Sequence, residues 1–490
     1  MLTRFAAATL MLLSTTAIAH AQQRGATRGG SAEAPAWDVN APPGATVRQV
    51  RIDTDEGTWM NVDVSPDGQS IAFDMLGDIY VMGIAGGTPR RITSGLAYDQ
   101  QPRFSPDGRR IAFTSDRAGG DNIWVMNADG TGARAITSET FTLLNAPAWS
   151  PDGRFIAARK HFTTQRSAGT GEIWLYDVNG TGGGQQLIER PNPQHQKELG
   201  EPVFAPDGRS IYYTRDASPG GTFQYAQDSN EGAFRIERYE IDSGERSTVA
   251  GGPGGAVRPT PSPDGRWLAF VRREGGTSRL FVKDLESGRE QRIYDDMDLD
   301  LQETWAIQGV YPNMDWTPDS RSIVFWAGGK IRRIAPEGGN ASEIPFRVAD
   351  TRAVIDPVLP AIDAAPANVT TRMIRFPNLS PDGSQIVYES LGRLWIRAAT
   401  GNAQPRRLTA PDGDFQLWPS WSRDGRSIVF VSWNDQRLGE IRTVAADGSG
   451  QRTVTSAPGH YARPRFSPDG QTIVFERGSG GFLTSSLYSG

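Results

Sequence analysis

A four-residue turn, Ser105-Pro106-Asp107-Gly108, constrains the fold of this chain more than any other feature, because it recurs with strand-like residues on both sides. Proline at the second position presets φ, the aspartate carboxylate caps the turn locally, and glycine takes the positive φ that closes a hairpin. Pro102-Arg103-Phe104 precedes the turn and Ile111-Ala112-Phe113 follows it. The sequence therefore predicts two short strands that meet at this turn.

The same unit returns eight more times, at intervals of 40 to 63 residues. Ser320 replaces the glycine in one copy, and Arg423 replaces the proline in another. Each copy continues into further short strands, giving four strands and three turns per repeat, which is typical of a propeller blade. We therefore expect an all-β fold of four-stranded antiparallel blades. The aspartates of the other copies are Asp67, Asp152, Asp207, Asp264, Asp319, Asp382, Asp424 and Asp469.

A second proline recurs three residues before the turn serine or the residue that replaces it. Proline cannot donate to a sheet ladder, so it belongs on a sheet edge. The innermost strand of a blade has a free edge toward the central channel, which favours this strand for the prolines. The alternative is that they only mark loop ends before the strand. These residues are Pro102, Pro147, Pro202, Pro259, Pro377, Pro419 and Pro464.

This pattern resembles the PD40 or WD40-like repeats of TolB-type β-propellers over most of residues 46–490. Residues 91–134 and 199–240 are similar to the propeller part of secreted bacterial proteins that carry an amidohydrolase domain after it. The stretches Tyr225-Ala226-Gln227-Asp228 and Tyr311-Pro312-Asn313-Met314-Asp315 suggest that subgroup. The resemblance implies a metal-dependent amidohydrolase domain after the propellers, with zinc held there by a His-x-His pair.

The start of the chain is typical of an export signal. Arg4 precedes an apolar run over residues 5–18 that is too short to span a membrane, and Ala19-His20-Ala21 fits a cleavage site. We therefore predict a signal peptide over residues 1–21 and a periplasmic or secreted protein; an uncleaved anchor is the alternative. No later stretch is long and apolar enough to span a membrane. Residues 22–45 are rich in Gly, Ala, Arg and Pro and are predicted to be a flexible linker.

Six copies of the turn fall within residues 46–346, which we predict to form one six-bladed ring. A ring must close, since an open end would expose sheet edges, and the early strand at residues 47–52 is expected to pair with the last blade. The repeat lapses over residues 347–370, the predicted connection. Three further copies in residues 371–490 predict an incomplete, truncated second propeller; an extension of the first ring to nine blades is the alternative.

Composition and motifs narrow the classes of function. The chain has no cysteine, a formal net charge of -5 and no basic stripe, which argues against thiol chemistry and nucleic-acid binding. Its four histidines form no His-x-His or His-Glu-x-x-His pattern, and there is no Gly-x-Ser-x-Gly or phosphate loop. The sequence thus predicts no catalytic residue and no cofactor in this chain, and any enzymatic role rests on the resemblance.

Polar residues four positions before the turn serine, at the start of the inner strands, are predicted to surround the mouth of the channel. Asp63, Arg103 and Asp315, two residues further on, would complete a ring of mixed charge. Such a mouth could capture or gate a peptide or a partner segment. The alternative is a solvated channel wall with ion pairs between blades. The candidates are Asn61, Gln101, Glu201, Arg258, Asn313 and Arg463.

An acidic run offers a candidate calcium site. Asp295, Asp296, Asp298 and Asp300 lie within six residues, and alternating carboxylates can ligate this cation. The run lacks the glycine and the terminal bidentate glutamate of an EF-hand loop, so a solvated acidic loop between blades is the alternative.

Two classes of function follow. The first is an exported module that binds protein or peptide or gates substrate, with an amidohydrolase domain beyond residue 490 as the partner that the resemblance implies. The alternative is the propeller part of a tricorn-like or prolyl-oligopeptidase-like peptidase, or a stand-alone periplasmic scaffold.

Overall fold

The repeated turn folds as its residue types require. In the copy at Ser105, the serine Oγ donates to Asp107 Oδ1 (2.5 Å) and accepts from Arg110 N (2.9 Å). Asp107 Oδ1 accepts from Arg109 N (3.1 Å), and Gly108 has a φ of +69°. The serine hydroxyl and the aspartate carboxylate thus satisfy backbone groups inside the turn, so the two flanking strands leave it in antiparallel register.

The computed structural model describes residues 38–163, 169–180, 183–224, 227–356, 362–410 and 412–478. Regular structure in these residues is almost entirely β-strand, apart from the 3-10 helix η1 (Ser229–Glu231). None of the helical structure in these ranges has the length and apolar character needed to cross a membrane. The predicted signal peptide lies outside the described residues, as do residues 22–37 of the predicted linker.

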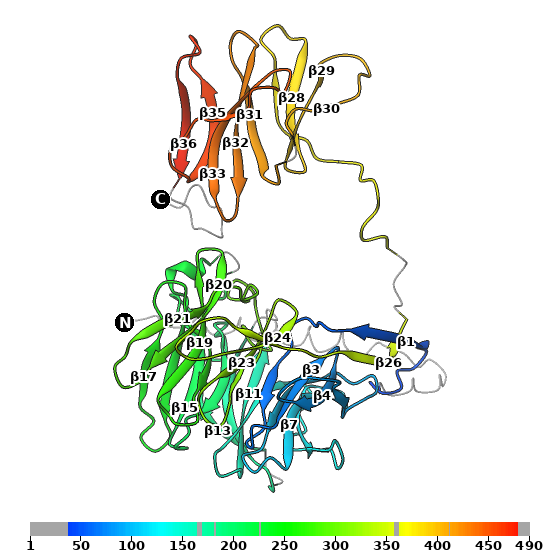
Figure 1. Ribbon diagram of the computed structural model, residues 1–490, viewed down its shortest axis with the longest axis vertical. Coiled ribbons are helices and arrows are strands. Elements are labelled where there is room, and N and C mark those ends of the chain that lie inside the picture. Colours follow the sequence, from blue (N-terminus) through cyan, green and yellow to red (C-terminus); the bar gives the residue numbers. More distant parts are fainter. Residues whose placement is uncertain are drawn as a thin grey trace, which may run out of the picture.

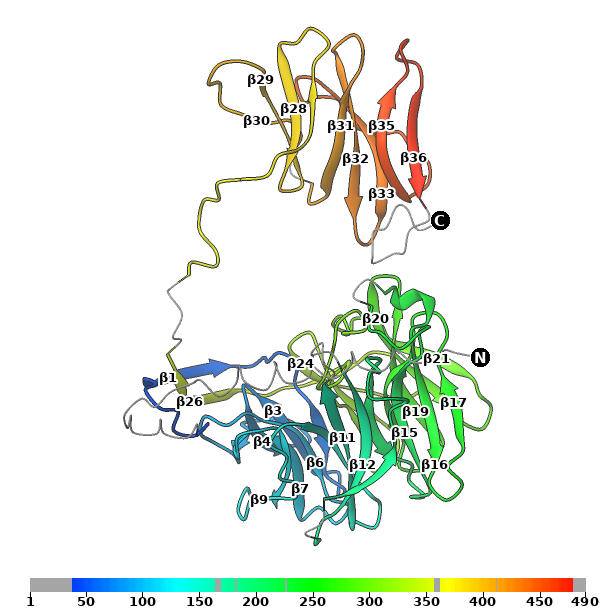
Figure 2. The same ribbon diagram turned by 180° about the vertical axis from the view of Figure 1, so that it is seen from behind.

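Six successive four-stranded antiparallel sheets follow one another between residues 62 and 344 (Figures 1 and 2). The first two comprise β2 (Val62–Val64), β3 (Ser70–Met75), β4 (Asp78–Gly83), β5 (Arg90–Arg91), and β6 (Asp99–Phe104), β7 (Arg110–Ser115), β8 (Asn122–Asn127), β9 (Arg134–Ala135). The next two comprise β10 (Leu143–Trp149), β11 (Phe155–Thr163), β12 (Gly169–Asp177), β13 (Gln185–Ile188), and β14 (Leu199–Phe204), β15 (Ser210–Asp216), β16 (Phe234–Glu240), β17 (Arg246–Ala250). The last two comprise β18 (Val257–Pro261), β19 (Trp267–Glu274), β20 (Thr277–Asp284), β21 (Glu290–Tyr294), and β22 (Asp315–Trp316), β23 (Ile323–Ala327), β24 (Lys330–Ile334), β25 (Ser342–Ile344).

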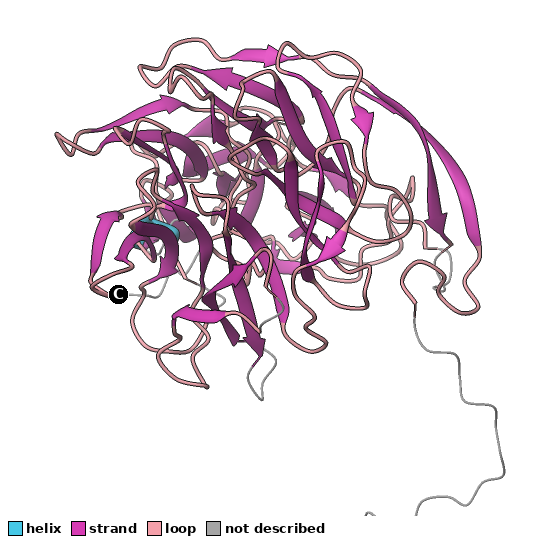
Figure 3. Cartoon of the chain, turned by 90° about the horizontal axis from the view of Figure 1, so that it is seen from below, coloured by secondary structure: helices cyan, strands magenta, loops and turns pink. Residues whose placement is uncertain are grey.

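These six sheets close into a ring around a common centre (Figure 3). The sixth sheet bonds to the first, since Val62 N donates to Asn313 O (3.0 Å) and Val64 N donates to Asp315 Oδ2 (3.0 Å). The turns also meet across the junction: a Cβ placed on Gly68 would lie 3.3 Å from Pro318 Cδ. Apolar side chains fill the spaces between adjacent sheets, as between the first and second sheets with Ala72, Ile79, Ile111, Phe113 and Met126. The all-β propeller fold expected from the repeats is confirmed.

Contrary to the sequence prediction, the strand at the start of the described chain does not pair with the last blade of the ring. β1 (Val47–Thr54) pairs with β26 (Val348–Ile355) in a separate two-stranded sheet, and both views show the two strands side by side (Figures 1 and 2). The expected pairing of β1 with the last blade was wrong, because that blade already has its own outer strand, β25. The predicted connection at residues 347–370 accordingly begins with a strand. Arg352 of β26 fastens this ribbon to the first sheet through Asp78 (2.8 Å) and Leu76 O (2.7 Å).

Three further sheets follow within residues 375–478, and we call them the second unit. The first two have four strands and the last has two described strands. Val474 of the last sheet is 65% exposed, whereas Ala112, which holds the equivalent position in the ring, is 0% exposed. Among the described residues, no further sheet therefore packs over Val474. The strands are β27 (Arg375–Leu379), β28 (Gln385–Ser390), β29 (Arg393–Ala398), β30 (Arg406–Arg407), β31 (Phe415–Trp421), β32 (Ser427–Asn434), β33 (Leu438–Ala445), β34 (Arg452–Thr453), β35 (His460–Phe466) and β36 (Ile473–Gly478).

Candidate functional site

The recurring prolines lie on the first strand of their sheets, which is an end strand in each sheet order, as the sequence predicts. The residue before each proline has a left-handed backbone, with φ values of +48° to +57°, and the strand pairing shifts register there. A left-handed non-glycine residue is strained by about 1–3 kcal/mol, so it persists only where other contacts hold it. In the ring these residues are Gln101, Ala146, Glu201 and Arg258.

Hydrogen bonds between neighbouring sheets hold these bulges. Asp74 Oδ2 accepts from Gln101 N (2.7 Å), and Gln101 Oε1 in turn accepts from Ala146 N (2.7 Å). Further round the ring, Glu201 Oε2 accepts from Arg258 N (2.7 Å). At Gln101, Ala146 and Arg258 the bulge therefore turns its N–H toward a polar side chain of a preceding sheet, and a buried bond from sheet to sheet offsets the strain.

A loop of the chain itself closes one end of the channel. We call residues 301–313, between β21 and β22, the axial loop. Gln101 Nε2 donates to Gln308 O (2.6 Å), Arg159 Nη1 donates to Ile307 O (2.7 Å), and Val310 N donates to Glu201 Oε1 (2.6 Å). Because these partners lie on three different sheets, the loop sits across the centre of the ring.

Of the residues predicted to surround an open mouth, Asn61, Gln101, Glu201 and Arg258 lie beneath this loop, and Asn313 is its last residue. Asn61, Gln101, Glu201, Arg258 and Asn313 are at most 5% exposed. The structure brings them together, but they bond to one another and to the axial loop. Asn313 N donates to Asn61 Oδ1 (2.8 Å), for example, and Arg258 Nε donates to Tyr311 O (2.6 Å). Arg463, in the second unit, is exposed and pairs with Glu476 (3.0 Å).

Glu201 and Arg258 form the most densely bonded pair of this group. Arg258 Nη2 lies 3.0 Å from Glu201 Oε1, and Thr214 Oγ1 donates to Glu201 Oε2 (2.6 Å). Burial lowers the pKa of Arg258 to about 10, although Glu201 opposes the shift. Gly309 lets the loop approach, because a Cβ there would lie 2.2 Å from Arg258 Nη2 and its φ is +112°.

The opposite end of the channel opens into a cavity of about 410 Å³. One proline from each repeated turn of the ring lines it, so we call this rim the proline collar: Pro66, Pro106, Pro151, Pro206, Pro263 and Pro318. Trp149, Trp316, Phe104 and Phe204 add aromatic surface. A mostly apolar concavity with a few converging polar groups is the usual form of a binding site.

The ionisable residues that line the cavity are Asp63, Arg103 and Asp315. Arg103 Nη1 donates to Asp63 Oδ1 (2.9 Å), while Phe104 N donates to Asp63 Oδ2 (2.6 Å). Asp315 lies near enough to Asp63 for the two carboxyl groups to affect each other's pKa. Burial, reinforced by Asp63, raises the pKa of Asp315 to about 8, and burial also raises that of Asp63. The predicted ring of mixed charge is thus split between the two ends of the channel.

These shifts predict how stability depends on pH. Buried carboxyl groups with raised pKa values keep protons in the folded state that the unfolded chain releases, so stability falls as pH rises. For Asp315 the window runs from about pH 4, near its unfolded pKa, up to its folded value of about 8. We expect the urea midpoint of the ring to fall across this window. Asp315→Asn should flatten the fall, and an unchanged slope in this variant would contradict the assignment.

The acidic run predicted as a calcium candidate is dispersed among separate partners. Asp295 pairs with Arg279 (2.9 Å), Asp298 accepts from Gly328 N (2.6 Å), and Asp300 is buried against Arg273 (2.6 Å). Asp296 completes the run. Among the described residues, no group of three or more His, Cys, Asp or Glu side chains could hold a metal ion.

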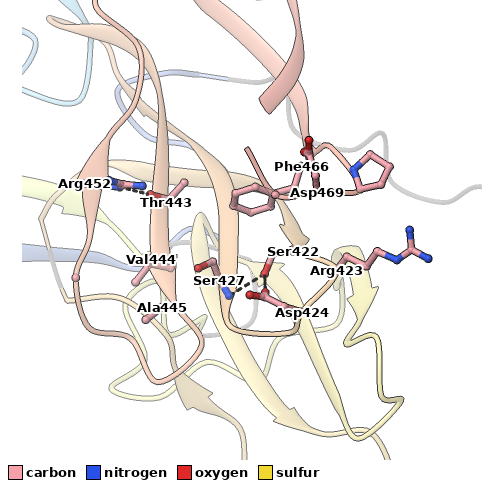
Figure 4. A pocket seen from close by; sticks show the side chains of 13 residues that line it. Ser422, Arg423, Asp424, Ser427, Thr443, Val444, Ala445, Arg452, Phe466 and Asp469 are labelled. Atoms are coloured by element: carbon pink, nitrogen blue, oxygen red, sulfur yellow. Dashed lines mark hydrogen bonds between the residues drawn. The ribbon is translucent and has the colours of Figure 1, made fainter. Parts of the chain in front are cut away.

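A smaller cavity of about 300 Å³ lies between the last two sheets of the second unit (Figure 4). Its polar side chains bond to one another, with Ser422 Oγ donating to Asp424 Oδ1 (2.6 Å) and Arg452 Nε donating to Thr443 Oγ1 (3.2 Å). A cavity of the ring between Asp207 and Asp264 has the same place relative to two successive turns. A cavity at this place is therefore a recurring result of how neighbouring sheets pack.

The sequence reasoning missed both ends of the channel. It did not recognise the axial loop, although the segment between β21 and β22 is the longest inter-sheet connection of the ring and contains Gly309. It used the turn prolines only as turn formers, although their sixfold recurrence in the ring was the available sign of a shared surface.

Among solved structures, TolB from Acinetobacter baumannii superposes with a TM-score of 0.44 at 18% identity, covering 60% of this chain and 64% of that one. Tricorn protease superposes with a TM-score of 0.41 at 17% identity, covering 86% of this chain and 38% of that one.

In sequence, Tricorn protease homolog 1 of Streptomyces coelicolor is 23% identical over 408 residues, 78% of this chain and 29% of the relative. A Bacillus subtilis protein named Uncharacterized peptidase YuxL is 27% identical over 234 residues, 48% of this chain and 30% of the relative. The chain thus spans under a third of either relative. Residues 60–217 match the family model of the tricorn protease N-terminal β-propeller domain. Residues 60–217 are therefore similar to the N-terminal β-propeller domain of tricorn protease, and the chain is similar in sequence to proteins named as peptidases.

Proposed function

We propose that the ring is the peptide-recognition part of a peptidase and receives a peptide segment inside the proline collar. The cavity of about 410 Å³ at the open end of the channel carries this proposal, because its prolines and aromatic side chains offer an apolar surface with charged groups at one side. Sequence similarity to proteins named as peptidases supports the tricorn-like or prolyl-oligopeptidase-like alternative over the amidohydrolase one. The predicted signal peptide would direct the protein to the periplasm or the exterior.

The position of the axial loop determines which kind of peptide recognition we propose. Its backbone bonds to Gln101, Arg159 and Glu201 close the channel at the other end, so a peptide would enter and leave through the collar. We therefore propose a blind cup that holds a peptide segment, and not a passage that threads substrate through the ring.

The test is photocrosslinking with acetyl-Ala-(benzoyl-Phe)-Ala-amide, followed by mass spectrometry of the labelled peptides. We expect labelling at the collar and the flanking aromatic residues. Val203→Arg places a long charged side chain at a residue that lines the cavity and should reduce labelling at least about tenfold. Leu76→Arg changes an exposed residue that does not line the cavity and is the matched control. Labelling spread over the surface, or unaffected by Val203→Arg, would refute the cup.

A further inference from the structure

The cavity inside the proline collar has an unbalanced set of charges. Its ionisable lining consists of two carboxyl groups, Asp63 and Asp315, and one guanidinium, that of Arg103. Arg103 Nη1 forms an ion pair with Asp63 Oδ1 at 2.9 Å. Both side chains are largely buried, with 13% of the Arg103 side chain and 7% of the Asp63 side chain exposed. When all three groups are ionised, one negative charge is left without a cation beside largely buried side chains.

A proton on one of the two carboxyl groups would remove this imbalance. Asp63 already accepts from Arg103 and Phe104, so it is held as the ionised member of the pair. Burial and the nearby charge of Asp63 raise the pKa of Asp315 to about 8, so Asp315 is the member of the pair that keeps a proton at neutral pH. No other charged side chain lines the cavity.

We propose that the collar cavity binds an ammonium group carried by a peptide, either a lysine side chain or a free amino terminus, which displaces the proton of Asp315. This inference rests on the proposed function and names the class of peptide. An ammonium group has three donors and restores charge balance beside Asp315 and Asp63. The prolines of the collar suit its alkyl stem.

An inorganic cation fits the same site less well. Calcium takes six to eight oxygen ligands, whereas three of the four carboxylate oxygens here are already bonded to Arg103 Nη1, Phe104 N and Val64 N. The described part of the chain contains no group of three acidic or histidine side chains arranged around a metal. The apolar collar also favours an organic cation with a hydrocarbon stem.

Release of the Asp315 proton makes the affinity for the peptide depend on pH. The ammonium group enters charged, and the carboxyl of Asp315 releases one proton to solvent. Binding of a lysine peptide should therefore strengthen about tenfold per pH unit from pH 6 to 7 and level off near pH 8. The lysine amine stays charged throughout this range, because its own pKa is about 10.4.

The experiment is isothermal titration calorimetry of the full chain in two buffers with different ionisation enthalpies. The probes are acetyl-Ala-Lys-Ala-amide, Ala-Ala-Ala-amide and the neutral acetyl-Ala-Ala-Ala-amide. We expect a cationic probe to bind at least about tenfold tighter than the neutral one and to release close to one proton at pH 6.5. The tighter of the two cationic probes identifies the source of the ammonium group.

Asp315→Asn is a variant that keeps the local fold. Asp315 Oδ2 accepts from Val64 N (3.0 Å), and an asparagine does the same at the equivalent place in the second unit, where Asn378 Oδ1 accepts from Trp421 N (3.1 Å). We expect this variant to lose proton release and the preference for cationic probes while binding the neutral probe unchanged. Asp298→Asn, which removes a carboxylate outside the cavity, is the control.

The outcomes separate this inference from the function on which it rests. Equal affinity for the neutral and lysine probes, or binding without proton release, would overturn the ammonium site and leave peptide recognition standing. If no probe binds at all and the collar is not photolabelled, peptide recognition itself fails. Wild-type proton release alone decides the inference if Asp315→Asn does not fold.

Discussion

Replacing Glu201 by alanine is expected to lower the free energy of unfolding of the ring by about 3–5 kcal/mol, the range for breaking a buried ion pair. Glu201 is 3% exposed and accepts from Arg258 N, Thr214 Oγ1 and Val310 N. The variant leaves the Arg258 guanidinium, 3% exposed, without its carboxylate. It also removes the acceptor that ties the fourth sheet to the fifth and to the axial loop.

The measurement is urea unfolding followed by hydrogen exchange of peptides from β14 and β18, which report on the ring alone. Glu201→Gln keeps an acceptor oxygen and should lose less than Glu201→Ala. Glu286→Ala removes an exposed glutamate and should change stability by no more than about 0.5 kcal/mol. A loss below about 1 kcal/mol for Glu201→Ala, the level of a surface pair, would show that the pair is solvated.

The second large effect is expected from Arg273→Met, at about 3–5 kcal/mol. The Arg273 side chain is 0% exposed, and it donates to Asp300 through Nη2 (2.6 Å) and Nε (3.1 Å) and to Glu303 through Nη1 (2.8 Å). These contacts fix the start of the axial loop to β19. Removal of the guanidinium leaves the buried carboxylate of Asp300 unpaired, so the loop should loosen as well as the ring.

Hydrogen exchange in residues 301–313 separates this effect from a general loss of stability. We expect Arg273→Met to speed exchange there before β7 and β8 are affected. The double variant Arg273→Met, Asp300→Leu should recover much of the stability, since an apolar pair often replaces a buried ion pair without loss. Arg289→Met, at an exposed turn, is the matched control. Unchanged exchange in the axial loop of Arg273→Met would contradict its role as the anchor.

Much of the fold could be predicted from local sequence because its determinants are local. The hydroxyl of Ser105, the carboxylate of Asp107 and the positive φ of Gly108 act within six residues, so one copy of the turn already defines a hairpin. Repetition of that hairpin then predicts blades. The partner of β1 could not be predicted in this way, because residues 348–355 carry no repeat motif and lie about 300 positions away in the chain.

The candidate site could be predicted only in part. Asp63, Arg103 and Asp315 were found from their position two residues after the predicted start of the inner strands, and they do lie together. The residues two positions earlier were expected around an open mouth, yet Gln101 and Glu201 are covered. Their exposure depends on the path of the axial loop, and no periodic pattern in the sequence specifies that path.

The sequence by itself determined the blades, their turns and the prolines on the inner strands, since each depends on backbone preferences and hydrogen bonds within a few residues. Only the tertiary structure decided which end of the channel is open and that Asp63 and Asp315 lie together in a buried place. Both outcomes depend on burial and on charges brought together across the junction of the first and sixth sheets, and such contacts form only when the ring closes.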